Sequence, residues 1–209
     1  MPRYSLWAVL LWSSLSTLMA QQPAAPPASN APPSLQLTVQ REFIPNAGPV
    51  AHGQLLTQSN CLAFLFPPDS VARSDSAQQR VSFVARDDSY SLAVQLREGE
   101  RLTANDLAAA TWRAQLVARH PDLRELAAFP CHALGTNGPA LDFKWRTAGG
   151  LWLYSRAVLL PLPGGRLEVT LLADEAQFET AKHRLNSFLL TLHRSAPGEK
   201  AAVPVVVPD

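Results

Sequence analysis

Apolar and polar residues alternate along several segments of this chain, and a period of two predicts β-strands that are buried on one face. The first such segment spans residues 35–43, with Leu35, Leu37 and Val39 on one side. Residues 50–58 are a candidate partner strand, although a glycine interrupts them. These two segments predict a hairpin near the N-terminal end of the folded region.

More strands are predicted downstream of this hairpin. Residues 61–69 alternate until two consecutive prolines, which end a strand because proline cannot donate a hydrogen bond to the sheet. Residues 80–98 give the clearest hairpin, with a turn at Asp87 and Asp88. Glycine pairs at 149–150 and 164–165 mark two tight turns, since glycine accepts the positive φ that such turns need. The later strands are predicted at residues 123–134, 140–147, 151–160 and 166–172.

Two segments change to a spacing of three and four residues, which predicts helices. Thr103 and Asp106 resemble a capping box before the first helix, and Pro121 ends it. Asp174 and Gln177 likewise resemble a capping box before the second helix. The predicted buried faces contain Leu107, Ala110, Ala114 and Val117 in the first helix, and Phe178, Ala181, Leu185, Phe188, Leu189 and Leu192 in the second. Strands and helices in this order predict an α+β fold, an antiparallel sheet flanked by helices.

The first 20 residues have the features of a secretory signal peptide. Arg3 is followed by a mostly apolar run from Leu6 to Leu18, and Ala20 is a small residue at the expected cleavage site. The run is shorter than the about 20 apolar residues that span a membrane. Cleavage after Ala20 is therefore the preferred interpretation, and an uncleaved anchor is the alternative.

The rest of the chain divides into a spacer, one domain and a tail. Residues 21–34 are rich in proline and alanine and predict an extended spacer. Residues 196–209 have a similar composition and predict a disordered tail. Residues 35–195 are long enough for a single α+β domain.

Charge and hydropathy bound the localisation and the partners. The sequence has 18 Lys and Arg and 17 Asp and Glu, so loss of Arg3 with the signal peptide leaves 17 of each. A neutral chain gives no electrostatic reason to expect nucleic acid or an anionic membrane as a partner. No later apolar stretch is long enough to span a bilayer. We therefore expect a secreted or periplasmic protein without a membrane span after cleavage.

The sequence contains two cysteines, Cys61 and Cys131. Cysteines of an exported protein often pair, and closing this loop of about 70 residues would stabilise the fold by about 4 kcal/mol. A Cys61–Cys131 disulfide is therefore predicted. Two buried thiols on separate strands are the alternative, because the sequence does not report the distance between them.

The segments "CLAFLFPPD" (61–69), "DDSYSLAVQL" (87–96) and "PALDFKWRTAGGLWLYSRAVLLPLPGGRLEVTLLA" (139–173), followed by a final helix, carry a resemblance to a known fold. In the order and spacing of these elements, residues 60–194 resemble the PsbP-like proteins. That group includes the photosystem II extrinsic protein PsbP, a Ran-binding nuclear import factor and bacterial envelope proteins such as DcrB. The resemblance implies an α/β/α sandwich and an accessory or binding role. The family offers no catalytic motif to carry over.

Candidate catalytic and metal sites are weak. Cys131 and His132 are adjacent, but neighbouring residues of a strand point to opposite faces. Glu179 and His183 share a helix face, yet two ligands do not make a metal site. No nucleophile, zinc, calcium, dinucleotide or phosphate-loop motif occurs. We therefore predict no catalytic residues, no metal and no cofactor.

Aromatic and basic residues alternate on the paired strands 141–147 and 151–158. Tryptophan, tyrosine and arginine are enriched at the centres of protein interfaces. Aromatic residues also favour strands and fill cores, so a core role is the alternative. The possible partner surface consists of Trp145, Arg146, Trp152, Tyr154 and Arg156.

These observations favour an exported, non-catalytic binding or accessory domain of the cell envelope, with one or more protein partners. Two alternatives remain. The chain could be a structural subunit of an envelope assembly, or a small hydrolase with a site assembled from scattered His, Asp and Arg residues.

Overall fold

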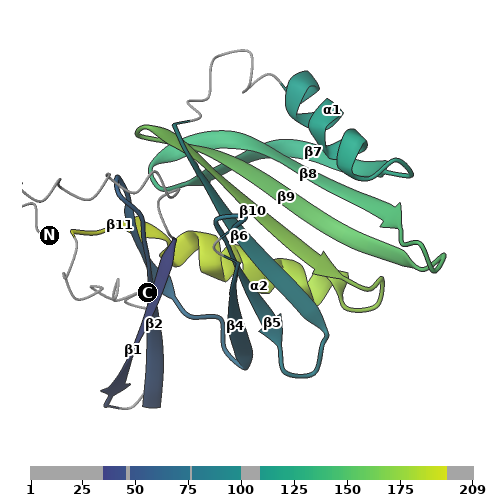
Figure 1. Cartoon of the computed structure of the whole chain (residues 1–209). Coiled ribbons are helices and arrows are strands. Elements are labelled where there is room, and N and C mark those ends of the chain that lie inside the picture. The colour runs from purple at the N-terminus through teal and green to yellow at the C-terminus, as the bar shows by residue number, and fades with distance from the viewer. Residues whose placement is uncertain (1–34, 46–47, 76, 100–108, 197–209) are drawn as a thin grey trace, which may run out of the picture. The chain divides into compact units, whose positions relative to one another are not determined.

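Most of the folded chain consists of strands in two antiparallel sheets (Figure 1). The computed structural model describes residues 35–45, 48–75, 77–99 and 109–196. The elements are β1 (Gln36–Ile44), β2 (Gly48–Leu56), β3 (Cys61–Leu65), β4 (Ser70–Asp75), β5 (Arg80–Ala85), β6 (Tyr90–Glu98), α1 (Ala109–Arg119), β7 (Arg124–Ala133), β8 (Thr136–Arg146), β9 (Trp152–Leu162), β10 (Gly165–Ala173), α2 (Phe178–Thr191) and β11 (His193–Arg194).

Several expectations concern residues outside the described part of the chain. These are the signal peptide, the spacer, nearly all of the C-terminal tail, and the capping box at Thr103 and Asp106 with the adjacent Leu107. Within the described part, no helix is both long and apolar enough to cross a bilayer.

The larger sheet has the strand order β4-β5-β6-β10-β9-β8-β7. The predicted hairpin at 80–98 forms β5 and β6, with Val81 opposite Val94. The predicted glycine turns join β8 to β9 and β9 to β10, and one glycine of each pair has a positive φ: 82° at Gly150 and 73° at Gly164. The alternating pattern therefore gave the correct hairpins in this sheet.

The smaller sheet has the order β1-β2-β3-β11, so the prediction of one sheet is wrong. The prolines at 67 and 68 explain the division. β3 ends at Leu65, and the chain passes these prolines before β4 begins the other sheet. Because proline has no N–H to donate to a neighbouring strand, Pro67 and Pro68 end β3 before the chain enters the larger sheet.

The two helices cover opposite faces of the larger sheet (Figure 1). The apolar residues that were predicted for α2 are all buried, and they join the main core. Trp112 and Leu116 of α1 pack on the other face, against Phe143 and Leu159 among others.

The predicted buried face of α1 is wrong. Ala110, Ala114 and Val117 are exposed, and the face with Trp112 and Leu116 is buried instead. Burial of an indole and a leucine removes more apolar surface from water than burial of two alanines and a valine. The larger side chains therefore determine which face of the helix meets the sheet.

Four phenylalanine rings connect the two sheets to α2. Phe64 of β3 lies 5.5 Å from Phe83 of β5 and 5.0 Å from Phe188 of α2, measured between ring centroids. Phe66 lies 5.2 Å from Phe83 in an edge-to-face arrangement. Aromatic pairs at such distances stabilise a core beyond the area that they bury. This cluster therefore joins the small sheet, the large sheet and the helix through apolar contacts.

Candidate functional site

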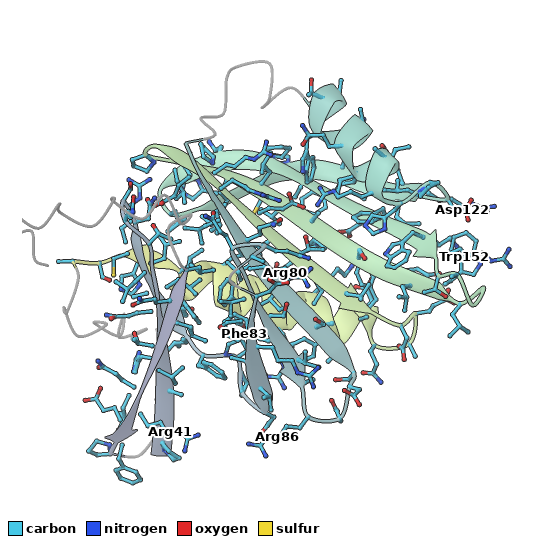
Figure 2. All side chains as sticks on the ribbon, in the orientation of Figure 1. Arg41, Arg80, Phe83, Arg86, Asp122 and Trp152 are labelled. Atoms are coloured by element: carbon cyan, nitrogen blue, oxygen red, sulfur yellow. The ribbon has the colours of Figure 1, made fainter. Side chains whose placement is uncertain are left out.

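Trp152 lies at one end of the β8–β9 hairpin (Figure 2), and three cations surround its indole ring. The guanidinium carbons of Arg124 and Arg146 lie 4.9 and 5.5 Å from the ring centroid, and the ammonium of Lys144 lies 5.1 Å from it. Strand register produces this arrangement, because Arg146 is opposite Trp152 and Lys144 is opposite Arg124. We call these four residues the Trp152 surface.

The positive charge of the Trp152 surface is not neutralised. Among the described residues, no carboxylate forms an ion pair with Arg124, Lys144 or Arg146. Arg146 donates one hydrogen bond, from Nε to the carbonyl oxygen of Gly150 at 3.1 Å. The remaining guanidinium and ammonium donors are available to an anion, and such charge-assisted hydrogen bonds are among the stronger ones in proteins.

Tyr154 connects the Trp152 surface to the core. The ammonium of Lys144 lies 5.5 Å from its ring, and the ring of Phe178 lies 5.6 Å from it on the inner side. The hydroxyl of Tyr154 donates a hydrogen bond to Glu175 at 2.6 Å, and this bond raises the pKa of the phenol. The surface therefore has a well-packed base, although the cations themselves reach solvent.

A buried ion pair lies next to the Trp152 surface. Arg156 donates to both carboxylate oxygens of Asp142, from Nε at 2.6 Å and from Nη2 at 2.8 Å. The ammonium of Lys182 lies 4.0 Å from the same carboxylate. The guanidinium of Arg156 also stacks over Phe129, with 4.6 Å to the ring centroid. Arg156 is therefore occupied inside the fold and is not available to a partner.

The structure divides the predicted partner surface. Arg146, Trp152 and Tyr154 lie together, whereas Arg156 is in the buried ion pair. Trp145 lies on the opposite face of the sheet because successive residues of a strand alternate. There Trp145 donates from Nε1 to Ser155 at 3.2 Å and stacks on His120, with 4.4 Å between ring centroids.

The sequence analysis missed Arg124 as a member of the surface. Arg124 is distant in sequence from Trp152, and only the register of β7 on β8 brings the two together. Lys144 could have been found, because it lies two residues before Arg146 and therefore faces the same side of the strand.

The predicted Cys61–Cys131 disulfide is absent, and both thiols are free. Cys61 is in β3 of the small sheet, where its sulfur lies 3.1 Å from the hydroxyl of Ser195. Cys131 is in β7, at the far edge of the large sheet. The Cα atoms of a disulfide usually lie about 4.4–6.8 Å apart, and Cys61 and Cys131 occupy separate places in the fold that do not bring their sulfurs together.

Free thiols predict a specific labelling result. Protein that is unfolded without a reductant should gain two alkyl groups in a mass measurement, one on each cysteine. In the native protein, burial raises the pKa of the Cys131 thiol, so its labelling near neutral pH should be slow. If the unfolded chain instead carried no alkyl group, the two cysteines would be joined in a disulfide after all.

The predicted absence of a catalytic or metal site remains an expectation. His132 donates a hydrogen bond from Nδ1 to the Oδ1 of Asn137 at 2.9 Å, and Glu179 pairs with Lys182 at 2.6 Å. His183 is exposed. The described residues contain no group of three or more His, Cys, Asp or Glu side chains that could hold a metal ion.

Comparison with known proteins identifies the fold. No family model and no curated protein matches the sequence. Among solved structures, the cyanobacterial PsbP of Synechocystis matches with a TM-score of 0.51 and 15% identity, over 83% of this chain and 100% of that chain. LpqN of Mycobacterium tuberculosis, described as involved in cell envelope biogenesis, matches with a TM-score of 0.49 and 13% identity, over 77% and 92% of the two chains. The likeness to the Synechocystis protein shows that the chain has a PsbP-like fold, as the sequence predicted.

Proposed function

We propose that this chain is an exported, non-catalytic binding module that docks an acidic segment of a partner protein on the Trp152 surface. The observation that carries the proposal is the group of three unpaired cations, Arg124, Lys144 and Arg146, around one half-buried indole ring. An acidic segment would neutralise the cations and cover the ring in a single contact.

The composition of the surface favours a protein partner. Tryptophan and arginine are the residues that most often dominate the energy of protein interfaces, as rigid rings and forked donors that lose little entropy on binding. A nucleic acid would require phosphate contacts over a broad basic field. Here the cations are confined to one end of two neighbouring strands, β7 and β8, and the chain as a whole is close to neutral.

The alternative of a structural subunit uses the same surface but differs in stoichiometry. A subunit of an envelope assembly should occupy its partner fully, whereas an accessory module should bind reversibly. Docking through exposed cations favours a reversibly bound accessory module, because such cations mainly accelerate association and make it sensitive to salt.

Site-specific photocrosslinking in the native host tests the proposal. A photoreactive amino acid at Leu126, an exposed residue of β7 two positions from Arg124, should capture one discrete protein partner. The double charge reversal Lys144→Glu/Arg146→Glu should lower the yield at least about tenfold, because the acidic segment is then repelled. The crosslinked peptide, identified by mass spectrometry, should be rich in Asp and Glu.

Two controls make the result specific. The same photoreactive residue at Leu190, an exposed position of α2, should not capture this partner. Arg73→Glu on β4, at the opposite edge of the sheet, should leave the yield unchanged. Capture that is equal from Leu190, or that survives the double charge reversal, would refute the Trp152 surface as the docking site.

A further inference from the structure

A cleft of about 710 Å³ lies between the β1–β2 hairpin and the end of the larger sheet, beside α2. Its apolar lining includes Val50 of β2, Leu65 and Phe66 at the end of β3, and Phe188 of α2. Pockets of about 300–1,000 Å³ with mainly apolar walls are typical of small-molecule sites. The cleft therefore has the size and the floor of a binding site for an apolar chain.

The β1 strand adds apolar surface at the mouth of this cleft. Arg41 lines the cleft, and Val39 and Phe43 lie on the same face of the strand because residues two apart share a face. Phe43 is 73% exposed and Val39 is 45% exposed. Phe43 is opposite Pro49, which lines the cleft, so this face of β1 extends the apolar surface beside it.

Three arginines from three separate elements converge on the cleft. They are Arg41 of β1, Arg86 at the β5–β6 turn and Arg184 of α2. Figure 2 labels Arg41 and Arg86, which lie on the hairpin and on the sheet side of the cleft, respectively. None of the three forms an ion pair with a described carboxylate, although Asp69 also lines the cleft. The local charge therefore complements an anion.

A second hollow, of about 420 Å³, continues from the two inner arginines. Arg86 and Arg184 line both cavities, together with Pro68 and Asp69. The other groups of this hollow are mostly polar: Asp87, Ser89, Tyr90, Gln177 and Thr180. The order along the surface is thus an apolar cleft, a pair of arginines and a polar hollow.

The backbone of the cleft disfavours a peptide ligand. An extended peptide binds mainly through backbone hydrogen bonds. Here the N–H of Phe66 donates to Ala51 at 2.8 Å, and the N–H of Leu65 donates to the hydroxyl of Thr191 at 3.1 Å. The prolines at 49, 67 and 68 have no N–H to offer. The cleft therefore presents apolar side chains and arginine donors, but few free backbone groups.

We propose that the cleft and the hollow together bind an anionic single-chain amphiphile, with the chemistry of a lysophospholipid. The acyl chain lies along Phe66 and Phe188, and the phosphate accepts hydrogen bonds from Arg86 and Arg184. The polar head beyond the phosphate occupies the hollow beside Tyr90. This site is separate from the Trp152 surface, so either proposal can fail without the other.

Calorimetric titration with dodecanoyl-lysophosphatidylglycerol, below its micelle concentration, tests the site. We expect saturable binding of one lipid per chain that weakens as salt is added. The double variant Arg86→Gln/Arg184→Gln should weaken binding at least about tenfold, because it removes charge-assisted hydrogen bonds to the phosphate. Ser187→Trp, at an exposed position of α2 that lines the cleft, should weaken it similarly by filling the chain site.

Matched controls separate this site from general binding to apolar surface. Arg73→Gln removes an exposed arginine outside both cavities and should leave the affinity unchanged. Laurate carries a carboxylate in place of the phosphate and lacks the glycerol groups that occupy the hollow, and dodecyl maltoside lacks the anion, so both should bind at least about tenfold more weakly. Equal binding of dodecyl maltoside, or binding that Ser187→Trp leaves intact, would overturn the proposal. So would the absence of lysophosphatidylglycerol binding to protein that circular dichroism shows to be folded.

Discussion

Replacement of Phe188 by alanine is expected to lower the free energy of unfolding by about 3–5 kcal/mol. Phe188 is 2% exposed, and its ring lies 5.0 Å from Phe64 of the small sheet and 6.0 Å from Phe83 of the large sheet. The substitution removes a buried ring and leaves a cavity where three elements meet. The total free energy of unfolding of a domain is about 5–15 kcal/mol, so the denaturant midpoint should fall substantially.

Two substitutions on the exposed side of the same helix are the controls. His183→Ala and Glu179→Ala should change the free energy of unfolding by no more than about 0.5 kcal/mol. His183 is exposed, and the side chain of Glu179 is 77% exposed, so its pair with Lys182 at 2.6 Å contributes little to stability. An unchanged midpoint in the Phe188→Ala protein would show that the phenylalanine cluster does not hold the two sheets to α2.

The elements that the sequence predicted well are those in which large apolar residues repeat with one clear period. In α2, residues such as Phe178, Leu185 and Phe188 leave only one face that can be buried. In β5 and β6 the alternation fixes both the face and the register, because a slip by one residue would expose the whole apolar set.

Weak or mixed patterns gave wrong or missing elements. β4, with the sequence SVARSD, has little apolar alternation and was not predicted. It is an edge strand that pairs with β5, and an edge strand can form with a single neighbouring strand and one covered face. In α1 the alanines suggested one face, but the two large residues Trp112 and Leu116 decided another. Propensity and spacing alone do not weigh side-chain size.

The candidate sites were only partly predictable for a similar reason. Arg146, Trp152 and Tyr154 belong to one hairpin, so their alternation was visible in the sequence. The arginines of the cleft, Arg41 and Arg184 among them, come from elements far apart in the chain, and no local pattern connects them. Only the packing of the small sheet beside α2 creates that site.

The buried ion pair supplies the second prediction of large effect. Asp142→Asn is expected to lower the free energy of unfolding by about 3–5 kcal/mol, because it leaves Arg156 buried without its counter-charge. The side chains of Asp142 and Arg156 are only 8% and 13% exposed, and the ammonium of Lys182 lies 4.0 Å from the same carboxylate. The amide nitrogen of the new asparagine cannot accept a hydrogen bond, so one guanidinium donor of Arg156 loses its partner. Denaturant unfolding measures the change.

A surface pair and a double variant determine whether this effect comes from a buried charge. Glu125→Gln breaks the Arg113–Glu125 pair, whose side chains are 37% and 42% exposed, and should change the free energy of unfolding by at most about 1 kcal/mol. In contrast, Asp142→Leu combined with Arg156→Met should recover part of the stability lost in Asp142→Asn, because apolar pairs often replace buried ion pairs without loss. Together with the single variants Asp142→Leu and Arg156→Met, this double variant forms a cycle whose coupling energy isolates the pair. If Asp142→Asn and Glu125→Gln have equal effects, the carboxylate is solvated in solution, and Arg156 is then free to join the Trp152 surface as the sequence first indicated.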